Sequence, residues 1–73
     1  MSDASTVAEL AAIADAVDRE LARVRDLASR RAAHAAASGD EDTGDDLLAA
    51  MYEAERVLAT AARIVRRATR APR

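Results

Sequence analysis

Apolar residues recur along most of the chain at the three- and four-residue spacing of an amphipathic helix. One series runs through the first half of the sequence and contains Val7, Leu10, Ala14, Val17, Leu21, Val24 and Ala28, continued by Arg31 and Ala35. A second series in the other half contains Leu47, Met51, Ala54, Leu58, Ala61, Val65 and Ala68. The pattern predicts two helices, each with one heptad-like seam.

Local signals predict where these helices begin and end. Thr6, with Glu9 three residues later, fits a capping box. Gly39 suits the left-handed residue that follows a helix, and Thr43 is a candidate cap for the second one. We therefore expect one domain over residues 1–73, with a first helix over about 6–38, a hinge at 39–43 and a second helix over about 44–70.

A hinge this short makes the two helices antiparallel neighbours. With the chain folded at the hinge, seam positions whose numbers add to 82 meet in seven successive layers, from Ala35 with Leu47 to Ala14 with Ala68. The predicted fold is an all-α, coiled-coil-like, two-helix antiparallel hairpin. Its intrahairpin seam contains Val17, Leu21, Val24, Ala28, Ala54, Leu58, Ala61 and Val65.

Charge is distributed unevenly along the chain. Seven acids and no arginine lie from 39 to 55, and six arginines and no acid lie from 56 to 73. Exposed ion pairs contribute only about 0.2–1 kcal/mol each, so these charges favour the antiparallel orientation more than they stabilise it. The expected pairs join arginines of the second helix to Asp3, Glu9, Asp15 and Asp18, and Arg25 to Glu55.

Further apolar side chains lie beside the seam, on the same side of both helices. The large ones, which we call the apolar face, are Ile13, Leu27, Val57 and Ile64. The seam layers are small, and a chain of this length without cysteine has neither a large core nor disulfides to stabilise it. We therefore expect the apolar face to pack against a second copy in a homodimeric four-helix bundle. Another helical protein is the alternative partner.

Glu20 interrupts the apolar face and needs a positively charged partner, such as His34 or an arginine of the second copy. Tyr52 is the only aromatic residue and a candidate anchor for a partner, because tyrosine is enriched at binding hot spots. The favoured function is that of a small non-catalytic, self-associating module for protein–protein interaction or regulation.

The arginine-rich end of the second helix gives an alternative function. Its candidate contacts to nucleic acid or to an acidic partner are Arg63, Arg66, Arg67, Arg70 and Arg73. The chain has no Phe or Trp on which bases could stack, and its net charge is −2. Nucleic-acid binding is therefore the second expectation, and a small secreted or structural assembly component is the third.

Nothing in the sequence favours catalysis. The chain contains no serine–histidine–aspartate arrangement, no glycine-rich phosphate loop and no ligand spacing around His34, so we expect no enzyme, metal or cofactor. No apolar run reaches the roughly 18 residues of a membrane span, and the first residues do not form a signal peptide. A cytoplasmic protein without membrane contact is expected. Its alanine content and the use of arginine alone as a basic residue are typical of GC-rich bacterial coding sequence.

Residues 14–21, "ADAVDREL", resemble part of the first helix of the AroQ-type chorismate mutases. The matching positions are Asp15, Val17, Asp18 and Leu21. The family's two arginines of this helix fall on Ala11 and Ala28, so the resemblance does not imply its activity. The predicted architecture is also similar to that of Rop-type hairpins, which dimerise into bundles, but a shared fold does not imply a shared function.

Overall fold

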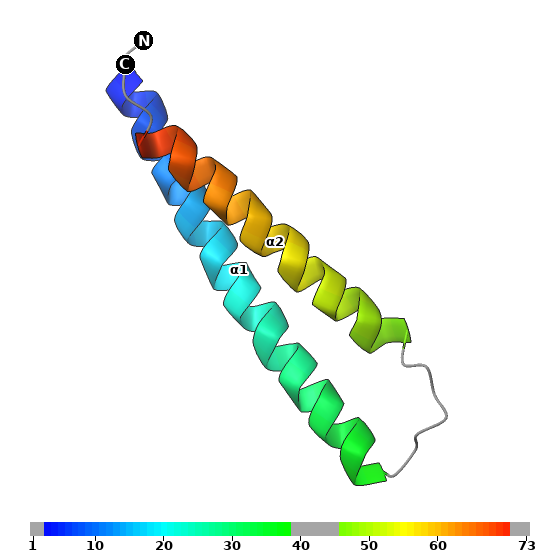
Figure 1. The fold of residues 1–73 in the computed structure, drawn as a ribbon. Coiled ribbons are helices and arrows are strands. Elements are labelled where there is room, and N and C mark those ends of the chain that lie inside the picture. Colours follow the sequence, from blue (N-terminus) through cyan, green and yellow to red (C-terminus); the bar gives the residue numbers. More distant parts are fainter. Residues whose placement is uncertain (1–2, 39–45, 71–73) are drawn as a thin grey trace.

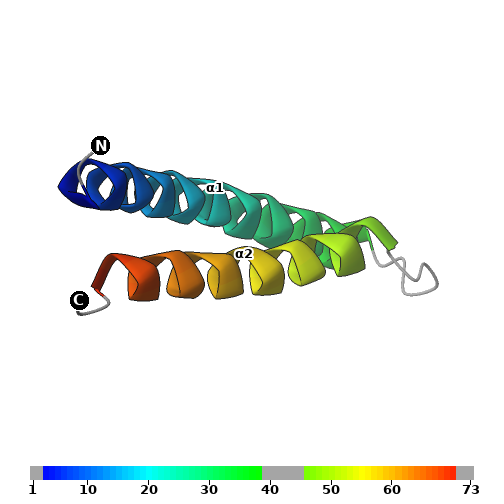
Figure 2. The same ribbon diagram turned by 90° about the horizontal axis from the view of Figure 1, so that it is seen from above.

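The computed structural model describes residues 3–38 and 46–70, which form two helices, α1 (Asp3–Ser38) and α2 (Asp46–Arg70). The helices run antiparallel and pack side by side along the length of α2 (Figures 1 and 2). The hairpin measures 56 × 15 × 14 Å, so it is a rod about as long as α1. The predicted all-α, two-helix hairpin is confirmed. The predicted hinge, with Gly39 and Thr43, lies outside the described residues.

The predicted start of α1 was wrong. The helix already includes Asp3, so Thr6 lies within its first turns and does not cap it. Asp3 stands in the first turn, where a carboxylate interacts favourably with the helix dipole. The charges of α2 also complement its helix dipole. Asp46 lies in the first turn, and Arg67 and Arg70 lie in the last.

The core between the helices is thin. Its buried residues are Ala14, Leu21, Ala28 and Ala62. Small side chains let two helix backbones approach closely, but they remove little apolar surface from water. The remaining seam residues are half-buried: Val17, Val24, Ala54, Leu58, Ala61 and Val65.

Relative to the predicted layers, α2 is rotated about its own axis. Leu47 and Ala68, which were expected in the seam, are exposed. Ala62 is buried more deeply than Ala61, and Leu48 is half-buried. A similar one-residue change occurs on α1, where Arg31 is exposed and Ala32 is half-buried. The layers of Arg31 with Met51, of Ala35 with Leu47 and of Ala14 with Ala68 are therefore wrong in detail.

Ion pairs between the helices accompany the rotation. Nε of Arg25 lies 3.7 Å from Oε1 of Glu55, as the sequence predicted. Nη2 of Arg66 lies 2.9 Å from Oδ1 of Asp15 and also binds Asp18. These pairs turn Glu55 and Arg66 toward α1, and the small alanines of α2 do not resist the change. The paired residue numbers add to 80, 81 and 84, close to the predicted register of 82.

Candidate interaction surface

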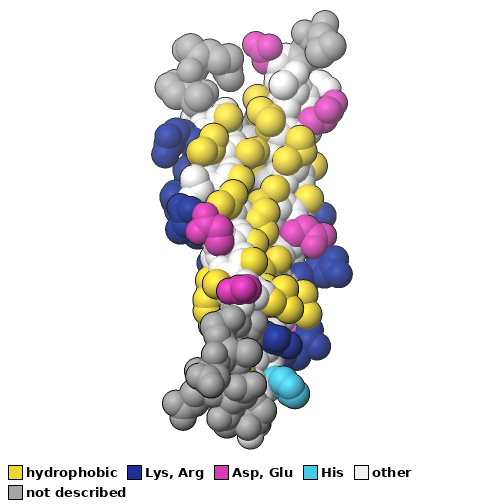
Figure 3. All heavy atoms as spheres, turned by 90° about the vertical axis from the view of Figure 1, so that its right-hand side faces the viewer, with side chains coloured by type: hydrophobic (Ala, Val, Ile, Leu, Met, Phe, Trp, Pro, Cys, Tyr) yellow, Lys and Arg dark blue, Asp and Glu magenta, His cyan; other side chains and the backbone are white. Residues whose placement is uncertain are grey.

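The apolar face is a continuous surface formed by both helices. Figure 3 shows hydrophobic side chains along the middle of this side of the hairpin, with charged side chains at both edges. Its members are about half exposed: Ile13 50%, Leu27 46%, Val57 50% and Ile64 56%. Leu47, 55% exposed after the rotation of α2, extends the surface toward the first turn of that helix.

Heptad spacing explains why these side chains share one side. Ile13 and Leu27 are two heptads apart on α1, and Val57 and Ile64 are one heptad apart on α2. Side chains at such spacings lie above one another along a helix. The seam residues lie next to them, so the apolar face is a lateral extension of the core.

The opposite side of the seam is closed by charge, and we call it the polar side. It consists of the pair Arg25–Glu55 and of Arg66 with Asp15 and Asp18. Hydrogen bonds that Arg66 donates to Asp18 and Asp15, together with Coulombic attraction, raise the pKa of the guanidinium above its usual value. Arg66 therefore joins the two helices, and its role as a predicted phosphate contact would compete with these pairs.

Three arginines remain at the outer surface of α2. Arg63, Arg67 and Arg70 are all exposed. Arg63 donates a hydrogen bond of 3.5 Å to Oγ1 of Thr60, and the structure records no ion pair to Arg67 or Arg70 from the residues it describes. Arg73 lies outside the described residues. Among the described arginines of the predicted basic surface, these three have no ion pair to α1, whereas Arg66 does.

Glu20 lies within the apolar face, midway between Ile13 and Leu27 on the same helix side. Its Oε1 atom is 3.2 Å from Nη1 of Arg23, so its partner comes from its own helix. This pair was missed in the sequence, although the three-residue spacing of opposite charges is the signal for it. Both side chains are more than half exposed, which leaves room for further partners.

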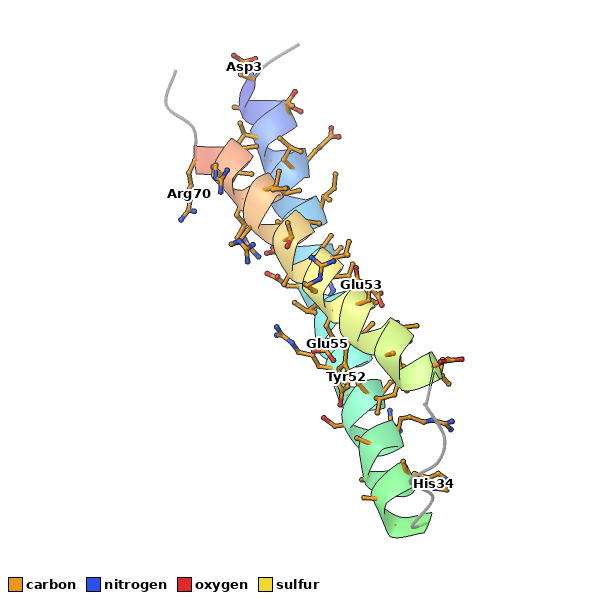
Figure 4. All side chains as sticks on the ribbon, turned by 45° about the vertical axis from the view of Figure 1, so that its right-hand side comes forward. Asp3, His34, Tyr52, Glu53, Glu55 and Arg70 are labelled. Carbon is orange, nitrogen blue, oxygen red and sulfur yellow. The ribbon has the colours of Figure 1, made fainter. Side chains whose placement is uncertain are left out.

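Tyr52 does not belong to the apolar face. Figure 4 shows it near Glu55, on the side of α2 where the polar side lies, and it is half exposed. Glu53 points away from Glu55, as expected from their spacing (Figure 4). Nε of Arg56 donates to Oε1 of Glu53 at 3.2 Å, and this hydrogen bond, followed by Coulombic attraction, lowers the pKa of Glu53. His34 is exposed near the end of α1 (Figure 4).

The described residues offer little to a metal or a small molecule. Within 3–38 and 46–70, no three His, Asp or Glu side chains gather closely enough to hold a metal ion. A surface depression of about 170 Å³ is lined by Arg23, Asp26, Leu27 and Arg30, all from α1. Neither described helix has the length and apolar character needed to cross a membrane.

Comparison of the chain with models of known protein families, with curated protein sequences and with solved structures gave no significant match. Function is therefore inferred from the surfaces of the hairpin itself.

Proposed function

We propose that the chain is a non-catalytic, self-associating helical hairpin that serves as a protein–protein interaction or regulatory module. Its apolar face binds a second copy, and the two hairpins form a four-helix bundle. One observation supports this most: Leu21 is the only large side chain among the buried residues described, whereas the aliphatic side chains of the apolar face, Ile13, Leu27, Val57 and Ile64, are about half exposed.

More apolar surface can be buried on this face than is buried between the two helices of one hairpin. Full burial of a valine, leucine or isoleucine side chain contributes about 1.5–3 kcal/mol, so a half-exposed one has about 1 kcal/mol left to gain. A two-fold interface uses each side chain twice, once from each copy. The three buried alanines inside the hairpin contribute far less, so the bundle has a larger apolar core than the single hairpin.

The charged edges of the apolar face favour a second copy as the partner. On α1 the edge carries Glu9 toward the start of the helix and Arg30 toward its end, each within four residues of a member of the face. On α2 it carries Glu53 toward the start and Arg67 toward the end. Each edge is therefore acidic at one end and basic at the other (Figure 3). A two-fold axis in the plane of the face can run along the helices or across them. In both cases the acidic end of an edge meets a basic end of the second copy.

The substitution Ile64→Arg tests this function. We expect it to shift the mass of the native chain from two copies to one, measured by analytical ultracentrifugation, because a charge would be placed twice in the interface. Ser29→Arg, at an exposed position away from the apolar face, is the matched control and should leave the mass unchanged. An Ile64→Arg variant that keeps the mass of the native protein would refute the proposal.

Nucleic-acid binding is a second candidate, favoured by the exposed Arg63, Arg67 and Arg70. If they contact phosphates, affinity for a DNA duplex falls steeply as salt rises, and each arginine removed reduces that salt dependence. The double variant Arg63→Glu with Arg70→Glu would abolish binding while leaving the dimer intact. No retention of duplex DNA at low salt would exclude this candidate alone.

A further inference from the structure

The large residues of the apolar face are symmetric about one level of the hairpin. Ile13 and Leu27 are centred on residue 20, and Val57 and Ile64 are centred on residues 60 and 61. Residue 20 is level with residues 60 and 61, because the ion pairs join residues whose numbers add to 80, 81 and 84. Residue 20 also lies at the middle of α1 (Asp3–Ser38).

We propose, building on the proposed function, that the second copy packs on the apolar face in the reversed orientation. The two-fold axis crosses the helices at the level of Glu20, so α1 lies antiparallel on α1 of the second copy and α2 on its α2. Ile13 then meets Leu27 of the second copy, and Val57 meets its Ile64. The two hinge ends, where α1 stops at Ser38 and α2 starts at Asp46, lie at opposite ends of the bundle.

Glu20 distinguishes this orientation from the other two-fold arrangement. If both hinge ends lay together, α1 would pack on α2 of the second copy, and Glu20 would be level with its residues 60 and 61, between its Val57 and Ile64. The nearest arginine there, Arg63, lies about 100° around the helix from Ile64 of the apolar face, so it points away from the face. Burying the Glu20 carboxylate between Val57 and Ile64 of the second copy, without a new charged partner, is costly.

In the reversed orientation, Glu20 has a partner across the axis. Arg23 lies three residues from Glu20, so Arg23 of the second copy is offset from Glu20 by only about 4.5 Å along the helix. Arg23 already binds Glu20 of its own helix at 3.2 Å. The two copies therefore bring two glutamates and two arginines into one alternating ion cluster at the axis.

One further feature matches this register. Glu9 is level with Arg30 of the second copy, because their numbers add to 39 and the axis pairs numbers that add to about 40. An acidic group thus meets a basic one at the edge of the apolar face.

Cysteine cross-linking tests the orientation. With Glu20→Cys, two thiols meet at the axis, and mild oxidation is expected to convert the protein to a covalent dimer. Ser29→Cys, on the other side of α1, is the matched control and should stay uncross-linked. If the protein is a dimer but Glu20→Cys does not cross-link, while Leu27→Cys with Val57→Cys does so between copies, the hinge ends lie together and the inference is wrong.

A distance measurement on His34→Cys gives an independent answer if Glu20→Cys folds poorly. Residue 34 is exposed and remote from the axis. In the reversed orientation, the two labels lie 28 residues apart along the bundle, about 42 Å. Double electron–electron resonance on the spin-labelled protein should therefore report a distance of about 40 Å or more between the two labels. A separation below about 20 Å, expected for helices about 10 Å apart, would overturn the proposed orientation.

Leu47→Arg adds a test with the native cysteine-free chain. In the reversed orientation, Leu47 lies beyond the described end of the second copy's α2, so the variant should remain a dimer. With the hinge ends together, Leu47 would pack against Ala35 of the second copy, and the variant would dissociate. A monomeric native chain refutes the proposed function itself, whereas these orientation tests on a confirmed dimer refute only the further inference.

Discussion

The two sides of the seam use the same pair of helices but satisfy their surfaces in different ways. On the polar side, Arg66 reaches from α2 to two carboxylates of α1, and Arg25 reaches back to Glu55. On the apolar face, side chains of the size of Ile13 and Ile64 have about half of their surface in water. The charged groups of the polar side find their partners within one chain, whereas the side chains of the apolar face are about half exposed.

This difference separates fold specificity from assembly. Exposed ion pairs add little stability, but they are satisfied only at this level and rotation of α2, so they favour one arrangement of the hairpin over others. The rotation turns Leu47 outward and adds it to the exposed apolar surface. The contacts that define the hairpin therefore also decide which apolar side chains of α2 are exposed.

The largest expected effect comes from a charge on the apolar face. Ile13→Glu should weaken dimerisation at least 100-fold, equivalent to about 2.7 kcal/mol, because the carboxylate is placed in the interface from both copies. The concentration dependence of the sedimentation coefficient measures this change. Ala12→Glu, the next residue back and exposed, is the control and should dimerise normally. If both variants weakened dimerisation equally, the effect would not be specific to the apolar face.

A smaller effect is expected on the polar side. Arg66→Met keeps an apolar side chain but removes the ion pairs to Asp15 and Asp18. We expect the midpoint of thermal unfolding, followed by circular dichroism at fixed protein concentration, to fall by a few degrees at low salt. The difference from the native chain should shrink at high salt, where exposed charges are screened. If Arg66→Met lowered this unfolding midpoint more than Ile13→Glu does, the ion pairs, and not apolar burial, would be the main source of stability.

The smallest effect concerns one titration on the outer surface of α2. Arg56→Met should raise the pKa of Glu53, because the hydrogen bond and the positive charge that lower it are removed. In the native chain, a lowered pKa stabilises the folded state above the ordinary pKa of a glutamate, and this contribution is lost as pH falls through the folded-state pKa. NMR titration of the Glu53 side-chain carboxyl measures the shift. An unchanged pKa would show that the pair is not maintained in water.

The sequence predicted the hairpin because its two heptad series match at one constant register. Heptad spacing places each series along one side of a helix, so the two series can pack together. It also predicted the pair of Arg25 with Glu55. It could not determine the rotation of α2, because alanines at 61 and 62 make either residue an equally small core side chain. The burial of Ala62 depends on where Arg66 finds its carboxylates, which is a tertiary effect.

The candidate surface was predictable in part. The spacing of Ile13, Leu27, Val57 and Ile64 placed them on one side, and all four are exposed in the hairpin. Leu47 was missed because the heptad pattern assigned it to the seam. The Glu20–Arg23 pair was missed because an interrupting charge was considered only in relation to distant partners.

Sedimentation equilibrium of the native chain, at low and at high salt, tests most directly whether the apolar face binds a second copy. We expect twice the chain mass of 7.7 kDa at both salt concentrations, because apolar burial is not screened by salt. A folded species of 7.7 kDa at every protein concentration would contradict the account and leave the apolar face to a different protein.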